Sequence, residues 1–341
     1  MVLLERERES RIFHGSFHSI ISLENLLISW QEFLKGKRKR KDIAEFSIHL
    51  MDNIIALHKE LRNKTYRHGD YLAFKINDSK PRDIHKASVC DRLLHHAIYR
   101  ILYPYFDRKF IFDSYSCRKD KGTHKALNRF RKLAMKVSRN NTKTTWVLKG
   151  DISKFFANID HQILKSILGQ YIRDEDILWL FGEVIDSFQA KGKNSIGLPL
   201  GNLTSQLLVN IYMNEFDEFI KRNLKVKYYM RYADDFIVLG GSRLYLVNLI
   251  PLISDFLEKR LGLSLNPNKL SIKTYSSGVD FLGWVHFPGF RVLRTATKKR
   301  IFRRLKQNQA STTLTSYLGL LKHGNTYGIT KSLLEKTLKK V

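Results

Sequence analysis

The sequence predicts an α+β fold in which helices lie on one face of a sheet, and two observations lead to this prediction. The middle of the chain runs in the order strand, helix, helix, strand–turn–strand, helix, strands. Short apolar segments such as WVLKGD and FIVLGG alternate with longer segments such as SQLLVNIYMNEFDEFIKR, whose apolar residues recur every three or four positions. This order is typical of a split βαβ unit.

The segments that precede this region are mostly helical. Their expected elements are helices within residues 23–62, a strand over 71–76, and helices over 86–106 and 124–137. The stretch NDSKPRD, which follows the strand, is typical of a turn, and Pro104 is expected to end the helix that contains it. Between the first helical segments lies KGKRKRK, which is either a solvated loop or a loop that faces phosphates.

The second half of the chain continues the alternation. Asp160 is expected to cap a helix over 161–168, and YYMRYADDFIVLGG predicts two strands joined at an Asp pair. A helix over 243–261 follows, and then short strands around LSIKTYSS and VDFLGWVHF. The last 51 residues, from Arg291, hold 13 Lys and Arg against one acid, Glu335, and predict helices with a basic face.

The composition indicates an intracellular protein that binds a polyanion. The 60 Lys and Arg outnumber the 32 Asp and Glu, which gives a net charge of +28, and Tyr and Phe are interspersed among the cations, as in proteins that bind nucleic acid. No apolar run could span a bilayer, and the N-terminus is too charged for a signal peptide. Cys90 and Cys117 cannot make a disulfide framework, and the adjacent His95 and His96 are expected to be packing or surface residues.

Two adjacent carboxylates, Asp234 and Asp235, interrupt the apolar runs of YMRYADDFIVLG. One interpretation is a hairpin whose turn is Asp-Asp, since turns favour Asp. The flanks are almost entirely apolar or aromatic, however, and a buried carboxylate is costly unless it is paired or bound to a cation. The sequence therefore favours a role for the pair beyond that of a turn.

A third carboxylate, Asp151, ends the apolar strand WVLKGD. Three acids at neighbouring strand ends could hold two Mg²⁺ ions about 4 Å apart, the arrangement used for phosphoryl transfer. Carboxylate oxygens are the hard ligands that suit Mg²⁺. The sequence thus predicts a magnesium site formed by segments that lie far apart along the chain.

Several ordered blocks of the sequence resemble those of reverse transcriptases. The blocks similar to the fingers are KPRDI, DRLLHHAIYRILYPYF and SYSCRKDKGTHKAL. The blocks similar to the palm are WVLKGDISKFFANIDH, GLPLGNLTSQLLVNIYMNEFD, YADD, the lysine-bearing LSLNPNKLSI and the primer-grip block VDFLGW. The blocks occur in the family's order and together cover most of the chain. They therefore identify the resemblance, which YADD alone would not do.

The resemblance implies a right-hand polymerase with a split-βαβ (RRM-like) palm, helical fingers and a helical basic thumb. It implies an RNA-directed DNA polymerase that uses two Mg²⁺ ions, template RNA, the cDNA/RNA heteroduplex and dNTPs. The expected domains are a helical N-terminal extension (1–70), fingers (71–145), a palm (146–290, with 186–210 returning to the junction of fingers and palm) and a thumb (291–341).

The resemblance also implies roles for residues around the first catalytic block. Asp151, Asp234 and Asp235 correspond to the metal ligands, with the backbone carbonyl of Ile152 as a further ligand. Phe156, five residues after Asp151, occupies the steric-gate position, where an aromatic ring would clash with a ribose 2′-OH. The alternative for Phe156 is an ordinary core residue.

Further roles are implied outside the acidic blocks. Arg82, helped by Lys80, would hold the triphosphate of the incoming dNTP; the alternative is a solvated turn charge. Lys269 would protonate pyrophosphate or neutralise charge, and residues 281–284 would position the primer end, although Trp284 could merely pack. Leu200, in Pro-Leu-Gly, stands where most of the family has glutamine, beside the incoming nucleotide.

Within the family, GLPLGNLTSQ and SYLGLLKHGNTYGI are most similar to reverse transcriptases of diversity-generating retroelements. These copy a template-repeat RNA into cDNA with errors at adenines, and the resemblance implies a small basic, oligomeric accessory protein as partner. It also implies a cytoplasmic protein encoded by a bacterium, an archaeon or a phage. Group II intron enzymes usually read PQG at this block and carry long C-terminal domains, which are not expected here because the sequence ends soon after the thumb.

Other functions remain open. The chain could be another bacterial reverse transcriptase, of the retron, antiphage-defence or group II intron-like type. It could also be a catalytically weak RNA-binding protein, although the three acids and Phe156 argue against that. A two-metal nuclease would leave the fingers and primer-grip blocks unexplained.

Overall fold

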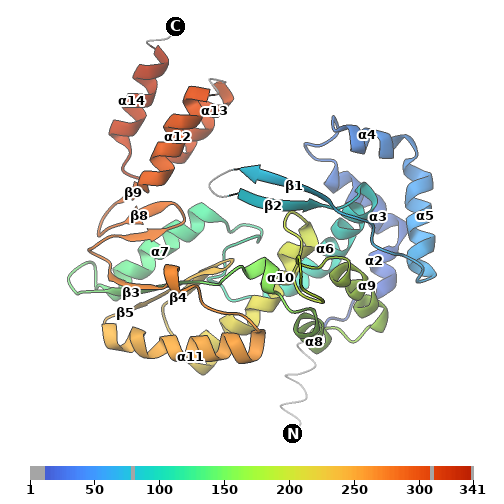
Figure 1. The fold of residues 1–341 in the computed structure, drawn as a ribbon, viewed down its shortest axis with the longest axis horizontal. Helices are drawn as coiled ribbons and strands as arrows, with labels where there is room; N and C mark the ends of the chain where they lie inside the picture. The colour runs from blue at the N-terminus through green and yellow to red at the C-terminus, as the bar shows by residue number, and fades with distance from the viewer. Residues whose placement is uncertain (1–11, 78–80, 308–310, 339–341) are drawn as a thin grey trace. The chain divides into compact units, whose positions relative to one another are not determined.

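A computed structural model describes residues 12–77, 81–307 and 311–338 of the chain (Figure 1). The chain divides into two compact units, each built from several separate segments. The first contains Met1–Phe112, Ile152–Asn223 and Asp255–Ser264, and the second contains Asp113–Asp151, Leu224–Ser254 and Leu265–Val341. Within the described residues, no helix has the length and apolar character needed to cross a membrane.

The first unit is mainly helical. Its helices are α2 (Phe17–Ile21), α3 (Leu23–Phe33), α4 (Lys41–Ile48), α5 (Leu50–Arg62), α6 (Val89–Lys109), α8 (His161–Tyr171), α9 (Glu175–Asp186) and α10 (Leu203–Glu218), with a π-helical turn at Phe219–Asn223. A 3₁₀ turn, η1, covers Phe155–Asn158. Strands β1 (Leu72–Asn77) and β2 (Pro81–Lys86) form a separate antiparallel hairpin. The helical prediction for residues 23–62 is thus confirmed, as three helices.

Two local predictions in this unit are wrong. The helix α6 does not stop near Pro104 but continues to Lys109. A proline inside a helix removes one backbone hydrogen bond, but the burial of Leu102, Tyr103 and Phe106 around it keeps the segment helical. The expected turn NDSKPRD is also shorter than predicted, because β2 already begins at Pro81.

The second unit contains the central sheet, whose strands are β3 (Trp146–Asp151), β4 (Tyr229–Tyr232), β5 (Asp235–Gly240) and β6 (Ser271–Thr274). All neighbours are antiparallel, in the order β4-β5-β3-β6. This is the strand order of a split βαβ unit. A smaller antiparallel sheet contains β7 (Val279–Phe281), β8 (Trp284–His286) and β9 (Arg291–Leu293).

Helices lie on both faces of the central sheet, rather than on one as predicted. Figure 1 shows α7 (Thr123–Val137) on one side of the sheet and α11 (Arg243–Leu261) along the other. The strands supply apolar residues to both faces, since side chains alternate along a strand. Gly150 is required in β3 because the Phe236 ring of the neighbouring strand would lie 2.3 Å from an added Cβ.

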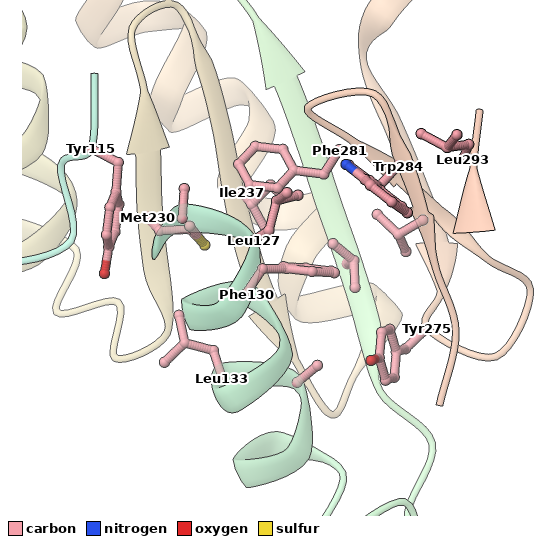
Figure 2. Close-up of a cluster of buried hydrophobic side chains, with 14 of the residues drawn as sticks. Tyr115, Leu127, Phe130, Leu133, Met230, Ile237, Tyr275, Phe281, Trp284 and Leu293 are labelled. Carbon is pink, nitrogen blue, oxygen red and sulfur yellow. The ribbon is translucent and has the colours of Figure 1, made fainter. Parts of the chain in front are cut away.

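The core on the α7 side joins this helix to both sheets (Figure 2). Phe130 of α7 is fully buried, and its ring centroid lies 5.8 Å from that of Phe281 and 5.9 Å from that of Tyr275. Three C-terminal helices, α12 (Thr295–Gln307), α13 (Ser311–Leu321) and α14 (Tyr327–Leu338), add one buried residue each, namely Ile301, Leu321 and Leu333. The predicted basic helices are therefore anchored in the same core as the sheet.

Candidate active site

The three predicted acidic residues meet at one end of the central sheet. Asp151 is the last residue of β3 and pairs in register with Asp235, the first residue of β5. Asp234 lies in the tight turn between β4 and β5, which the Tyr232–Asp235 pair closes. Asp151 is only 3% exposed, and the turn residue Ala233 has a φ of +54°. The sheet register therefore brings together acids that are 83 positions apart in sequence, from 151 to 234.

A buried arginine that is not among the predicted site residues holds this turn. Arg231 of β4 is 1% exposed, and its guanidinium donates to the carbonyl of Ala233 (3.0 Å) and to Oγ of Ser114 (3.2 Å). Its backbone N–H donates to the carbonyl of Asp113, and its carbonyl accepts from the N–H of Tyr115. Arginine before a YADD-type turn is the signal that could have indicated this role.

The electrostatics of the acids are those of like charges held close together out of water. Burial is the largest influence on Asp234 and, with the neighbouring Asp235 and Asp151, raises its pKa to about 6. Burial likewise raises the pKa of Asp235, although Lys149 opposes that shift. The folded chain thus holds two carboxylates whose negative charges are only partly compensated.

Asp151 differs from the other two acids because cationic and amide groups contact it directly. Nζ of Lys269 lies 2.5 Å from Oδ2, and Nδ2 of Asn266 donates to Oδ1 at 3.3 Å. The N–H of Asn266 donates to the Asp151 carbonyl at 2.8 Å, and its side chain caps the 3₁₀ turn Pro267–Lys269. The structure thus places Lys269 at the acids and adds Asn266, whose Asn-Pro pair is a turn signal in the sequence.

The acids fit a hard cation chemically. In the described ranges, no three His, Cys, Asp or Glu side chains stand in a ready-made coordination arrangement, and the Asp151 carboxylate faces Lys269 and Asn266. The available donors are nevertheless all oxygens, which Mg²⁺ prefers. The raised pKa values of Asp234 and Asp235 indicate a local deficit of positive charge, which a divalent ion would remove.

The predicted primer-positioning segment is mostly core. Phe281 and Trp284 are 0% and 1% exposed, so neither ring is available to a nucleic acid. Leu282 and Gly283 form the turn between β7 and β8 with φ values of +48° and +84°, and both are half-buried. Lys149 of β3 donates to the carbonyl of Asp280 (2.9 Å), which ties this hairpin to the strand that ends at Asp151.

In the first unit, the predicted nucleotide-contacting residues are linked through the segment that joins α9 to α10. The N–H of Leu198 donates to the carbonyl of Phe156 (2.8 Å), and the N–H of His85 in β2 donates to the carbonyl of Leu200 (3.0 Å). Phe156 and Leu200 are both half-buried, so each retains exposed surface. This segment therefore connects the predicted gate residue to the hairpin that carries Arg82.

Arg82 lies exposed on β2, opposite Ile76 of β1. Phe74 and Ile84 form the next cross-strand pair on the same face of the hairpin. Phe74 and Ile76 are 42% and 44% exposed, so the guanidinium shares its face with an exposed apolar surface. Lys80, the predicted helper of Arg82, lies outside the described residues.

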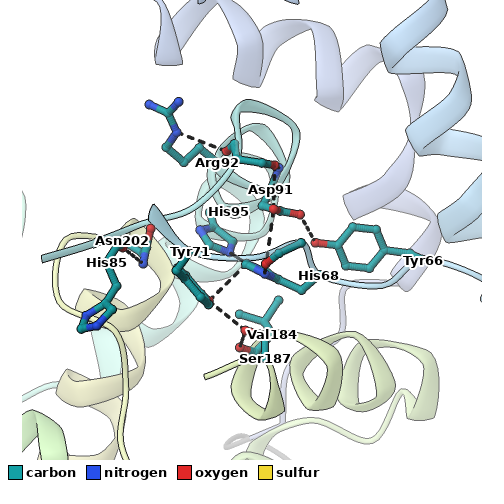
Figure 3. Close-up of polar contacts among 12 residues, drawn as sticks. Tyr66, His68, Tyr71, His85, Asp91, Arg92, His95, Val184, Ser187 and Asn202 are labelled. Carbon is teal, nitrogen blue, oxygen red and sulfur yellow. Dashed lines mark hydrogen bonds and ion pairs between the residues drawn. The ribbon is translucent and has the colours of Figure 1, made fainter. Parts of the chain in front are cut away.

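A buried polar network supports the base of this hairpin (Figure 3). Asp91 of α6 accepts hydrogen bonds from the hydroxyls of Tyr66 (2.7 Å) and Ser88 (2.6 Å). His68 lies 3.9 Å from the Asp91 carboxylate, and its Nε2 lies 3.2 Å from Nε2 of His95. Burial opposes ionisation of Asp91, but His68 and the two hydroxyls hold its pKa below the ordinary value.

The histidine pair in α6 has the packing role that the sequence predicted. Burial, with His68 nearby, lowers the pKa of His95 to about 3. Burial and the neighbouring Lys37 and Arg92 lower the pKa of His96 to about 4, and its ring packs 5.3 Å from that of Phe33. Both imidazoles are therefore neutral components of the first unit.

The basic face predicted for the C-terminal helices is present on α12. A shallow groove along this helix has a lining of six residues: Thr295, Lys298, Lys299, Phe302, Arg303 and Lys306. Ile301 points the opposite way and is fully buried. The helix thus buries one face and exposes a row of cations on the other.

Comparisons with known proteins give the family. Residues 74–286 match the family described as reverse transcriptase (RNA-dependent DNA polymerase). The chain is 26% identical to Protein YkfC of Escherichia coli, over 61% of this chain and 63% of that protein. It is 24% identical to the group II intron-encoded protein LtrA of Lactococcus lactis, over 67% of this chain and 47% of that protein.

A further relative is a putative COX1/OXI3 intron 2 protein of Saccharomyces cerevisiae, 25% identical over 48% of this chain and 25% of that protein. The aligned regions span less than two thirds of each of these relatives. The family match itself covers more than half of this chain, including all three acids, Phe156 and Leu200. The chain therefore belongs to the reverse transcriptase family.

Proposed function

We propose that the chain is an RNA-directed DNA polymerase that extends a DNA primer on an RNA template by two-metal phosphoryl transfer. The observation that carries this proposal is the meeting of Asp151, Asp234 and Asp235 at one end of the central sheet, within the region that matches the family. Bound magnesium would activate the attacking hydroxyl and stabilise the leaving pyrophosphate. The acids are the residues that would hold it, together with the carbonyl of Ile152.

Other residues of the chain would bind and orient the substrates. Lys269 lies against Asp151 and would supply positive charge, or a proton, to pyrophosphate. Arg82, with Lys80, would bind the triphosphate, and Phe156 would exclude ribonucleotides. The cations of α12 would bind the backbone of the template–primer duplex, since Lys and Arg supply most of the affinity for phosphates.

The more specific proposal is a reverse transcriptase of a diversity-generating retroelement, with a small basic accessory protein. It rests on GLPLGNLTSQ, and above all on Leu200 where most of the family has glutamine. The second candidate is a group II intron-like enzyme, which the similarity to LtrA favours. A template repeat and a near-identical variable repeat beside the coding sequence would decide between the two.

The direct test is primer extension on an RNA template with dNTPs and Mg²⁺, with and without the small basic accessory protein encoded beside this chain. The proposal predicts cDNA that depends on template, dNTPs and Mg²⁺, and that shows errors at template adenines if the retroelement assignment holds. A folded chain that binds RNA but extends no primer under either condition would contradict the polymerase. Accurate cDNA at adenines would instead favour the group II intron-like alternative.

A further inference from the structure

A histidine of the first unit, absent from the catalytic proposal, makes a buried contact with the segment that joins α9 to α10. His161 is the first residue of α8, and its side chain is 0% exposed. Its Nε2 lies 2.7 Å from the carbonyl oxygen of Gly197. Because a carbonyl only accepts hydrogen bonds, Nε2 must carry the hydrogen and donate it. The imidazole of His161 therefore donates to the Gly197 carbonyl, which would lose this donor if leucine replaced the histidine.

Gly197, together with Ser195 and Leu198, joins this segment to the first catalytic block through backbone hydrogen bonds, and the N–H of His161 donates to the carbonyl of Ser195 (3.1 Å). The N–H of Gly197 donates to the carbonyl of Ile159 (2.7 Å), and the next N–H, that of Leu198, donates to the carbonyl of Phe156 (2.8 Å). Gly197 has a φ of +106°, and an added Cβ would lie 2.8 Å from Cβ of Ala190. Only glycine fits this position. The backbone at Gly197 therefore has no side chain of its own to hold it, and the imidazole of His161 supplies that contact.

The other ring nitrogen of His161 faces the beginning of the same segment. Nδ1 lies 3.3 Å from Oδ1 of Asp186, the last residue of α9, and makes no hydrogen bond among the described residues. Lys165 holds the second oxygen of Asp186, with Nζ 2.5 Å from Oδ2. The imidazole therefore lies between the start of the segment, at Asp186, and its fixed point, at Gly197.

We propose that His161 is a positioning residue for nucleotide selection. It acts through Gly197, which fixes Leu198 against Phe156 and thereby places Leu200, whose carbonyl accepts from His85 of the hairpin that carries Arg82. This inference rests on the proposed polymerase function. It assigns to His161 the choice and binding of the incoming nucleotide, not the chemical step, since the three acids belong to other segments of the chain.

The test compares two substitutions that differ in the donor. His161→Leu removes the hydrogen bond and leaves the Gly197 carbonyl unsatisfied, whereas His161→Gln retains an N–H donor of similar reach. For His161→Leu we expect the KM for dNTP to rise and the discrimination against rNTP to fall about tenfold, with kcat changed less. His161→Gln should recover most of both properties. Phe156→Ala provides the reference for lost discrimination.

A matched control is His286→Leu, a buried histidine of the second unit whose Nε2 has no hydrogen-bond partner among the described residues. It should leave KM and discrimination at their wild-type values. Amide hydrogen exchange supplies a readout that needs no activity: His161→Leu should speed exchange at the Gly197 and Leu198 amides, while His161→Gln should not. If leucine prevents folding, His161→Asn, too short to reach Gly197, replaces it.

Three results would overturn the positioning role. The first is unchanged exchange and unchanged discrimination in His161→Leu. The second is an equal loss in His161→Leu and His161→Gln, and the third is a loss confined to kcat. If wild-type protein extends no primer, the polymerase proposal fails, but the exchange comparison still tests whether His161 holds the segment.

Discussion

The two units of this protein each bury carboxylates, and they treat them in opposite ways. In the first unit, hydrogen bonds from Tyr66 and Ser88 and the nearby His68 keep the pKa of Asp91 low. In the second unit, burial and neighbouring acids raise the pKa of Asp234 to about 6, and burial raises that of Asp235. The negative charge of a buried aspartate is thus well compensated in the first unit and poorly compensated in the second.

The neighbours of a buried acid distinguish a structural carboxylate from a functional one. A buried charge whose neighbours donate to it contributes to the folded state, because its removal leaves those donors unpaired. Buried acids that lie close to one another destabilise the folded state unless a cation or a proton binds and neutralises their charge. Asp91 therefore belongs to the support of the β1–β2 hairpin, whereas the raised pKa values of Asp234 and Asp235 support the proposal that these two acids bind a cation.

The largest expected effect concerns activity at the poorly compensated acids. Asp235→Asn should lower primer extension roughly a thousandfold or more, because a metal ion that loses a charged ligand gives up several kcal/mol of transition-state stabilisation. RNA binding, measured by filter retention or fluorescence anisotropy, should remain at the wild-type value. A parallel loss of binding and extension would mean that the Asp pair is structural.

The next effect concerns the exposed cations, which stand outside both buried sites. Replacing Lys298, Lys299, Arg303 and Lys306 of α12 by Gln should reduce the slope of log affinity against log salt by roughly three, since each phosphate contact contributes about 0.7–0.9. Template–primer affinity measured at several salt concentrations gives the slope. An unchanged slope would assign this groove to a partner other than nucleic acid.

At the well-compensated acid, the effect should be on stability instead of chemistry. Asp91→Asn should lower the unfolding free energy by about 1–3 kcal/mol, because the hydroxyl donors lose their charged acceptor. The kcat of the folded fraction should change little. Denaturant unfolding and active-site titration separate the two quantities, and a loss of kcat at unchanged stability would break the distinction between the two regions.

Leu200 extends the comparison to an uncharged position of the first unit. An apolar wall senses mainly shape, whereas a hydrogen-bonding side chain penalises misfits by leaving polar groups unpaired. Leu200→Gln should therefore lower errors at template adenines, by about tenfold if the difference is near 1.4 kcal/mol, and lower those at other bases less. Sequencing cDNA from both enzymes on one RNA gives the answer. Identical error spectra would place low fidelity elsewhere.

The smallest expected effect is on the pH dependence of folding stability in metal-free buffer. The contributions of Asp234 and Asp91 to this dependence should have opposite signs. Asp234 has a folded-state pKa of about 6 against an ordinary 3.8, so the folded protein binds its proton more tightly and loses stability as pH rises through this range. Asp91 has a lowered pKa, so its contribution is present above the unfolded pKa and is lost as pH falls through the folded value.

Denaturant unfolding in the presence of EDTA, between about pH 3 and pH 8, measures how the unfolding free energy changes with pH, and so gives the sign of each contribution. Asp234→Asn should exceed wild type in stability by on the order of 1 kcal/mol above about pH 6, and the gap should close at acidic pH. The deficit of Asp91→Asn should instead shrink toward acidic pH. Curves that run parallel for all three proteins would show that neither acid is perturbed by its surroundings.

The sequence predicted those features that local patterns encode. The strand ends at Asp151 and Asp235, the Asp160 cap of α8 and the extent of α7 agree with the structure, because alternation, capping and helical periodicity are local signals. Pro104 was misjudged, since burial on both sides outweighs the missing backbone hydrogen bond.

The residues that the sequence did not indicate act through distant partners. Asn266 donates to Asp151 across 115 positions, and Arg231 donates to Ser114 across 117. His161 contacts Gly197 across 36 positions. No local pattern specifies such pairs, because they exist only once the sheet register and the connecting segments are in place.

The most direct test of the difference between the two acid sites is cation binding itself. Mn²⁺, which shares the oxygen preference of Mg²⁺ and is paramagnetic, can be titrated into wild type, Asp235→Asn and Asp91→Asn and followed by electron paramagnetic resonance. We predict equal binding by wild type and Asp91→Asn, and affinity about tenfold weaker or worse in Asp235→Asn. Binding by Asp235→Asn as tight as that of wild type would contradict the account.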